Sequence, residues 1–285
     1  MEESRVAALV GQIPNADTPD IASTFTGPAP EVAEKLFAEV LEGGPNSIME
    51  LIDMIRDPAE RGYQDFKPVY VLHGLAIHVG REGREAQREM FAKAVASKIG
   101  GEKPSKAVQG FLIRELQVAG GREVAGVLGK QLLDAELCDD AAMALIAIRE
   151  GAQEELTKAL PVAAGKCKLA VVQALGVLRD AGSVDALLEA AGDQDRGVRI
   201  AAAWALGNIG DPRGADAVLK ASGAEDGWER TQAAKACLVL AERLGVAGKK
   251  AEAARIYTRL RDTKTDSSEA YIREAAERGL AAGAS

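Results

Sequence analysis

Apolar residues recur at helical spacing along most of the chain, and short breaks containing Gly, Asp or Pro separate the segments. In the segment 198–209 the apolar residues stand at 198, 201, 202, 205, 206 and 209, which is one stripe of a helix with 3.6 residues per turn. From Glu31 onward, helical segments of roughly 10–17 residues alternate with such breaks, as in compact helical arrays. The pattern predicts a succession of paired helices.

An internal repeat underlies this pattern. Segment 168–188 repeats as 199–219, an offset of 31 residues, and Ala-Leu-Gly recurs at 174–176 and 205–207. Fainter copies lie one unit upstream at an offset of 30 and one unit downstream at an offset of 32. Because one helix pair cannot bury its apolar stripe alone, the pairs must stack.

The break after each first helix contains residues that favour a turn and the start of a new helix. Asp211 is predicted to cap the second helix, with Pro212 at its first position, and Gly207 and Gly210 are expected to loosen the end of the first helix. The structural turn residues are therefore Asp180, Asp211, Pro212 and Arg213.

These patterns give a domain organisation. Residues 1–30 are predicted to form a short helix followed by an extended arm rich in Pro, Thr and Asp. Residues 31–285 are predicted to form a single solenoid, with its clearest repeats at 167–244 and a last helix pair and cap at 245–285.

The string Val198-Arg-Ile-Ala-Ala-Ala-Trp-Ala-Leu-Gly-Asn-Ile-Gly-Asp-Pro-Arg213 resembles the short HEAT-like repeat named after phycobilisome lyases. The segment Gly248–Leu260 resembles the second helix of a tetratricopeptide pair, and the whole chain is similar to HEAT-repeat proteins of planctomycete-type bacteria, many of which carry export signals. The resemblance implies an all-α fold, a right-handed α-solenoid of stacked antiparallel helix pairs. It also implies protein–protein binding on the concave face.

Composition agrees with helices packed closely together. The chain has 285 residues, of which 47% are hydrophobic and only 4% aromatic, and alanine alone contributes 53. Alanine is the best helix former and a poor strand former, so a β-sandwich or barrel is excluded.

Net charge and hydropathy limit the kinds of partner that we expect, and the N-terminus bears on the location of the protein. A net charge of −8 is opposite to the basic footprint of a nucleic-acid binder, and no stretch is apolar enough to span a membrane. We expect another protein as partner and a monomeric or weakly associating chain. The location is cytoplasmic if Met1 is native, and exported or periplasmic if a signal peptide has been removed.

Catalytic and metal-binding residues are not evident. His73 and His78 lie five residues apart and diverge by about 140° on one helix, so they cannot form a metal pair. The three widely spaced cysteines read as buried free thiols. We predict no enzyme activity, cofactor or metal; the alternative, from the repeat type, is a tetrapyrrole (bilin) lyase or carrier.

Two features are candidates for partner binding. Trp204 stands where adjacent repeats carry Gln173 and Ala236, so it is either an exposed anchor or a ring packed between helices. Trp228 is expected to staple a helix starting at Glu229. The second feature is an acidic series on the second helices, which could meet a basic partner or be a solvated face: Glu154, Glu155, Asp185, Glu189 and Asp216.

Overall fold

The protein is described here by a computed structural model covering residues 4–15, 27–60, 62 and 66–283. Over these residues the chain is all-α, with sixteen α-helices, four short 3₁₀ turns and no strand. It forms two compact units, Met1–Ala152 and Gln153–Ser285. Both units are stacks of antiparallel helix pairs, so the predicted all-α solenoid class is confirmed.

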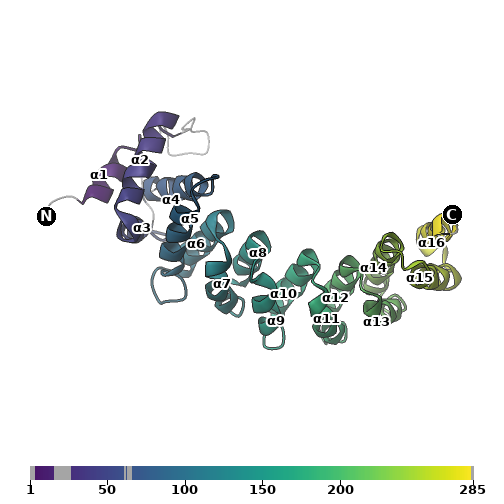
Figure 1. Cartoon of the computed structure of the whole chain (residues 1–285). Coiled ribbons are helices and arrows are strands. Elements are labelled where there is room, and N and C mark those ends of the chain that lie inside the picture. The colour runs from purple at the N-terminus through teal and green to yellow at the C-terminus, as the bar shows by residue number, and fades with distance from the viewer. Residues whose placement is uncertain (1–3, 16–26, 61, 63–65, 284–285) are drawn as a thin grey trace. The chain divides into compact units, whose positions relative to one another are not determined.

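The first unit stacks two layers of helices (Figure 1). Helices α2, α4, α6 and α8 pack side by side as one layer, α3, α5 and α7 form the other, and α1 packs against α3 and α4. Most of the predicted arm, residues 16–26, lies outside the described residues. The helix bounds are α1 (Arg5–Gly11), α2 (Pro30–Glu42), α3 (Gly44–Asp53), α4 (Lys67–Val79), α5 (Glu85–Ala96), α6 (Lys106–Ala119), α7 (Ala125–Gln131) and α8 (Cys138–Ile148).

The second unit repeats the same arrangement with greater regularity. The first helices α10, α12 and α14 form one layer, and the second helices α11, α13 and α15 form the other. Helix α16 packs on α15 and α14 at the end of the stack. The helix bounds are α9 (Ala152–Ala159), α10 (Gly165–Leu178), α11 (Val184–Ala190), α12 (Arg196–Ile209), α13 (Ala215–Ala221), α14 (Gly227–Val246), α15 (Lys250–Thr263) and α16 (Ala270–Gly283).

Glycine lets the first helices approach each other closely. A Cβ on Gly207 would lie 2.7 Å from the Ala236 carbonyl oxygen of α14, and one on Gly176 would lie 2.9 Å from the Cα of Ala205 in α12. The expectation that Gly207 loosens the helix end is therefore wrong. The Gly of each Ala-Leu-Gly string is buried in the helix and removes the atom that would hold neighbouring backbones apart.

The helix ends follow local capping chemistry. Asp195 and Asp226 cap α12 and α14, their side chains accepting hydrogen bonds from the backbone N–H groups of Val198 and Glu229. Gly210 ends α12 in the left-handed region at φ 78°, which a side chain would strain. Asp211 then accepts from the Arg213 N–H at the start of the next turn.

Helix α14 is longer than its neighbours. It has 20 residues, whereas α10 and α12 have 14 each. Gly210, which follows the last residue of α12, lies against the side chain of Arg243. The final residues of α14, up to Val246, therefore extend beyond the end of α12.

Candidate functional site

A series of ion pairs joins successive repeats of the second unit. Arg199 of α12 binds Glu229 of α14 with two hydrogen bonds of 2.7 Å, through Nε and Nη2. In the preceding repeat Lys168 makes a single contact with Asp193 in the loop before α12, and Arg230 of the following repeat pairs with Glu269 at 3.2 Å. The basic members stand 31 residues apart, so the sequence repeat is also a repeat of inter-repeat contacts.

The arginines of this series also hold the loops. Arg199 donates to the carbonyl oxygens of Asp193 and Gln194, each at 2.9 Å, and Arg230 donates to two loop carbonyls at 3.0 Å. The pKa of the Glu229 carboxyl is lowered, because Arg199 hydrogen-bonds its ionised form more strongly than partial burial disfavours it. These arginines and the Glu229 carboxylate therefore find their hydrogen-bond partners within the protein, where they hold successive repeats together.

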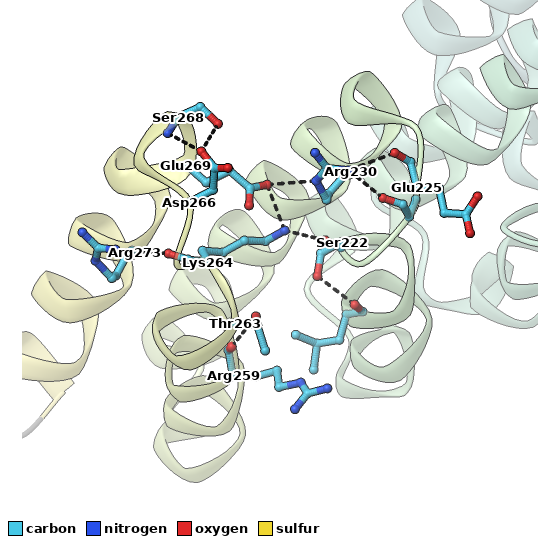
Figure 2. A network of polar contacts seen from close by, with 12 residues as sticks. Ser222, Glu225, Arg230, Arg259, Thr263, Lys264, Asp266, Ser268, Glu269 and Arg273 are labelled. Atoms are coloured by element: carbon cyan, nitrogen blue, oxygen red, sulfur yellow. Dashed lines mark hydrogen bonds and ion pairs between the residues drawn. The ribbon is translucent and has the colours of Figure 1, made fainter.

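A buried lysine fixes the last helix pair to the stack (Figure 2). Lys264 follows α15, is only 3% exposed, and donates from Nζ to the Ser222 carbonyl oxygen at 2.5 Å and to Glu269 Oε1 at 3.1 Å. Glu269 in turn accepts from Arg230 of α14. The chain after α15 is thereby tied to the ends of α13 and α14.

The cysteines differ from expectation. Cys237 is a free, buried thiol beside Ser222, and burial raises its pKa to about 12, so it is not a ready nucleophile. Cys138 and Cys167 are both disulfide-bonded, and the expectation of free thiols is wrong for them.

Trp204 lies on α12 with its ring partly covered. Its exposed fraction is 42%, and its ring packs over Gly176 of α10, where a Cβ would lie 2.6 Å from Cζ3. Val177, the next residue of α10, is 45% exposed. Trp204 is thus supported by packing against α10 and still partly open to solvent.

Trp228 is placed differently from the sequence prediction. Helix α14 begins at Gly227, capped by Asp226, so Trp228 lies inside its first turn. Its side chain is 61% exposed and does not staple the helix start. It is therefore a second exposed tryptophan, on another part of the second unit.

Most of the acidic candidates already have basic partners. Asp185 pairs with Arg213 at 3.1 Å, and Asp216 pairs with Arg255 at 2.7 Å, each across to the next second helix or turn. Glu154 and Glu155 both pair with Lys158 in their own helix. Glu189 is exposed, and among the described residues it makes no ion pair. The structure thus brings arginines to a surface whose charge appeared uniformly acidic in sequence.

The two histidines of α4 face different helices of the first unit. His73 Nδ1 lies 3.0 Å from Glu115 of α6, a carboxylate that is almost fully buried. His78 is buried against the Phe37 ring of α2, and its Nδ1 lies 2.8 Å from Glu34 with angles that do not form a hydrogen bond. Burial, with the charges of Arg84 and Arg81, lowers the pKa of His78, and Glu34 only partly opposes this.

The buried Glu115 carboxyl predicts a pH dependence of stability. Burial raises its pKa above the ordinary value of 4.5, more strongly than His73 lowers it. A raised pKa favours folding below the unfolded value and removes that stability as the pH rises through the folded value. We therefore expect Glu115→Gln to gain stability relative to the wild type as the pH rises above the ordinary carboxyl pKa, as measured by urea unfolding. Glu136→Gln, exposed in the same unit, is the control, and a gain that stays constant with pH would contradict the assignment.

Within the part of the chain that the structure describes, no three His, Cys, Asp or Glu side chains are grouped so as to hold a metal ion. Among the same residues, every helix is too short or too polar to cross a bilayer.

Sequence reasoning did not single out Lys264 or Arg243. Lys264 stands in the polar string Asp-Thr-Lys-Thr-Asp, which is typical of a solvated loop and carries no signal of burial. Arg243 follows a charged neighbour near the end of a long helix and reads as an ordinary solvated residue. The inter-repeat arginines did carry a signal, because Lys168, Arg199 and Arg230 share the repeat spacing.

Comparison with known proteins supports the repeat assignment. Residues 153–239 match the family model for HEAT repeats, from α9 into α14. The match is to HEAT repeats in general and does not identify the phycobilisome-lyase type or a planctomycete-type relative. This part of the chain therefore has the stacked helix pairs of HEAT repeats.

Solved structures that align with parts of the chain include two engineered proteins. One aligns over 88% of this chain and 71% of its own, with a TM-score of 0.46 and 19% identity. The other aligns over 84% of this chain and 98% of its own, with a TM-score of 0.33 and 19% identity. No curated protein sequence matches the chain.

Proposed function

We propose that this protein is a non-enzymatic scaffold or adaptor that binds another protein through the first-helix layer of its second unit. The observation that carries the proposal is the placement of Trp204. Its ring is held by packing over Gly176, yet 42% of the residue stays open to a partner. Tryptophan is enriched among the residues that dominate binding energy, and a supported ring loses little entropy on binding.

The surroundings of Trp204 support an interface there. Val177 of α10, the residue after Gly176, is also exposed, so α10 and α12 each present an exposed apolar side chain. The acidic series on the second helices is a weaker candidate, because Asp185 and Asp216 are already paired with arginines. Glu189 is the member of that series that we retain as a contact for a basic partner.

We expect Trp204→Ala to weaken binding of the protein partner at least tenfold, as for a typical hot-spot residue. The partner is recovered by cross-linking in native cells, purified, and titrated against the full chain by calorimetry. Since the ring is partly covered, the variant should also lose about 1–2 kcal/mol of stability.

Trp228→Ala is the matched control, because it removes the other exposed tryptophan of the second unit. It should leave partner affinity unchanged. Equal losses for the two variants would show that Trp204 is not the anchor. Failure to recover any protein that binds the purified chain stoichiometrically would count against a scaffold.

The alternative function is a tetrapyrrole lyase or carrier. It predicts a visible absorption band when the chain is incubated with bilin or haem. No contact among the described residues specifically favours it, and absence of the band would remove it.

A further inference from the structure

A groove of about 420 Å³ lies between the ends of α12 and α14. Its apolar lining includes Ile209, Val239, Val246 and Ala247, and Arg243 contributes a guanidinium group. Because α14 extends beyond α12, Val246 at the edge of the groove is 88% exposed, an unusual position for a branched aliphatic side chain. We call this the Arg243 groove.

The guanidinium in the Arg243 groove is poorly satisfied. Nε of Arg243 is buried, and among the described residues it has no hydrogen-bond acceptor. Nη2 reaches Asn208 Oδ1 only at 3.5 Å, the limit of a hydrogen bond. By contrast, Arg199 and Arg230, also half-buried, each bind a carboxylate and two backbone carbonyls. A buried donor without an acceptor is costly, so the groove favours an added carboxylate.

One carboxylate, Glu242, lines the groove and also a second cavity that contains Tyr257 of α15. The pKa of Tyr257 is raised chiefly by burial and secondarily by the charge of Glu242. No ion pair between Arg243 and a carboxylate is present among the described residues. The positive charge in the groove is therefore available to a ligand.

Apolar side chains lie on both sides of this charge. Asn208, which touches Arg243, stands one helical turn after Trp204, and its Nδ2 donates to the Trp204 carbonyl oxygen. Val246 stands three residues after Arg243. Trp204 itself does not line the groove, because its ring packs over Gly176 of α10; the apolar side chains around the charge are Ile209 on α12 and Val239 and Val246 on α14.

We propose that the Arg243 groove binds an acidic–aliphatic peptide segment, in which an internal Glu or Asp pairs with Arg243 and flanking aliphatic side chains contact Ile209 and Val246. An internal carboxylate fits better than a chain terminus, because apolar side chains of both α12 and α14 line the groove around Arg243. This inference rests on the proposed function and specifies the chemistry of the partner at that surface.

The test titrates the full chain by calorimetry. The probe is an acetylated, amidated peptide, Gly-Ser-Leu-Glu-Leu-Ser-Gly, compared with the same peptide carrying Gln in place of Glu. We expect the Glu peptide to bind at least tenfold more tightly, with a dissociation constant below about 1 mM. Equal binding of the two peptides, or no binding heat up to several millimolar, would overturn the proposal.

Two variants locate the effect. Arg243→Met keeps the side-chain stem against Gly210 and should abolish the preference for Glu over Gln, whereas Arg259→Met, exposed on α15, should retain it. A third peptide carries Gln and a free C-terminal carboxylate. If it binds as well as the Glu peptide, the internal-carboxylate assignment is wrong. Because the peptide comparison is made on a folded chain, its failure is separable from failure to find a protein partner.

Discussion

Lys264→Ala is expected to lower the free energy of unfolding of the last helix pair by about 3 kcal/mol. Lys264 is buried, and its ammonium group supplies a hydrogen bond to the Ser222 carbonyl and an ion pair to Glu269. The variant leaves that carbonyl without this donor and leaves the half-enclosed Glu269 carboxylate with Arg230 as its remaining partner. Removing one member of a buried charged network costs more than the pair itself contributes, because the other groups stay buried.

Hydrogen exchange of α15 and α16 is the direct measurement. In a stacked array each pair is stabilised mainly by its neighbours, so release of the Lys264 contacts should raise exchange at this end first. Lys249→Ala, which removes an exposed lysine just before α15, is the control and should change stability by less than about 0.5 kcal/mol. Exchange rates in α15 and α16 that match this control would show that the Lys264 contacts are not structural.

The fold class could be predicted because it depends on local patterns. The stripe through Val198, Ala202 and Ala205 and the turn at Asp211 are set by residues near each other in sequence, and the structure buries the stripe and caps the turn. The 31-residue offset then requires that each pair meet a similar pair. Nothing beyond periodicity and capping is needed to reach stacked helix pairs.

The polar contacts could not be predicted in the same way. Asp185 and Arg213 lie 28 residues apart, and Asp216 and Arg255 lie 39 apart, so their pairing depends on how successive repeats are rotated and spaced. That geometry is set by packing between helices, including the close approach at Gly176 and Gly207. Asp185 and Asp216, which belong to an acidic series in the sequence, are therefore members of ion pairs in the fold.

The candidate site, like the fold, could be predicted from the sequence only in part. The change of residue type at Trp204 relative to its repeat neighbours marks it in the sequence, and its part in binding stays a proposal. Arg243 gave no such mark, because its significance comes from a missing acceptor and from the extra length of α14. A missing hydrogen-bond acceptor such as that of Arg243 can be recognised only when the positions of the surrounding residues are known.

Gly207→Ala is expected to destabilise the second unit by about 2 kcal/mol, although alanine is the better helix former. The added methyl would lie 2.7 Å from the Ala236 carbonyl oxygen and 3.3 Å from its Cα. Because the obstacle is backbone rather than a flexible side chain, α12 and α14 must move apart, and packing along their whole contact is lost. The propensity gain of about 1 kcal/mol cannot offset this loss.

Gly245→Ala makes the comparison decisive, because this residue lies in the same α14 with nothing within 4 Å of its Cβ position. There the propensity gain acts alone, and stability should rise by about 0.5–1 kcal/mol. Opposite signs for the two substitutions in urea unfolding would show that the Ala-Leu-Gly glycine is fixed by interhelical distance. A gain at both positions would mean that the helices tolerate wider spacing, so that the repeat depends on its apolar stripe and not on close backbone contact.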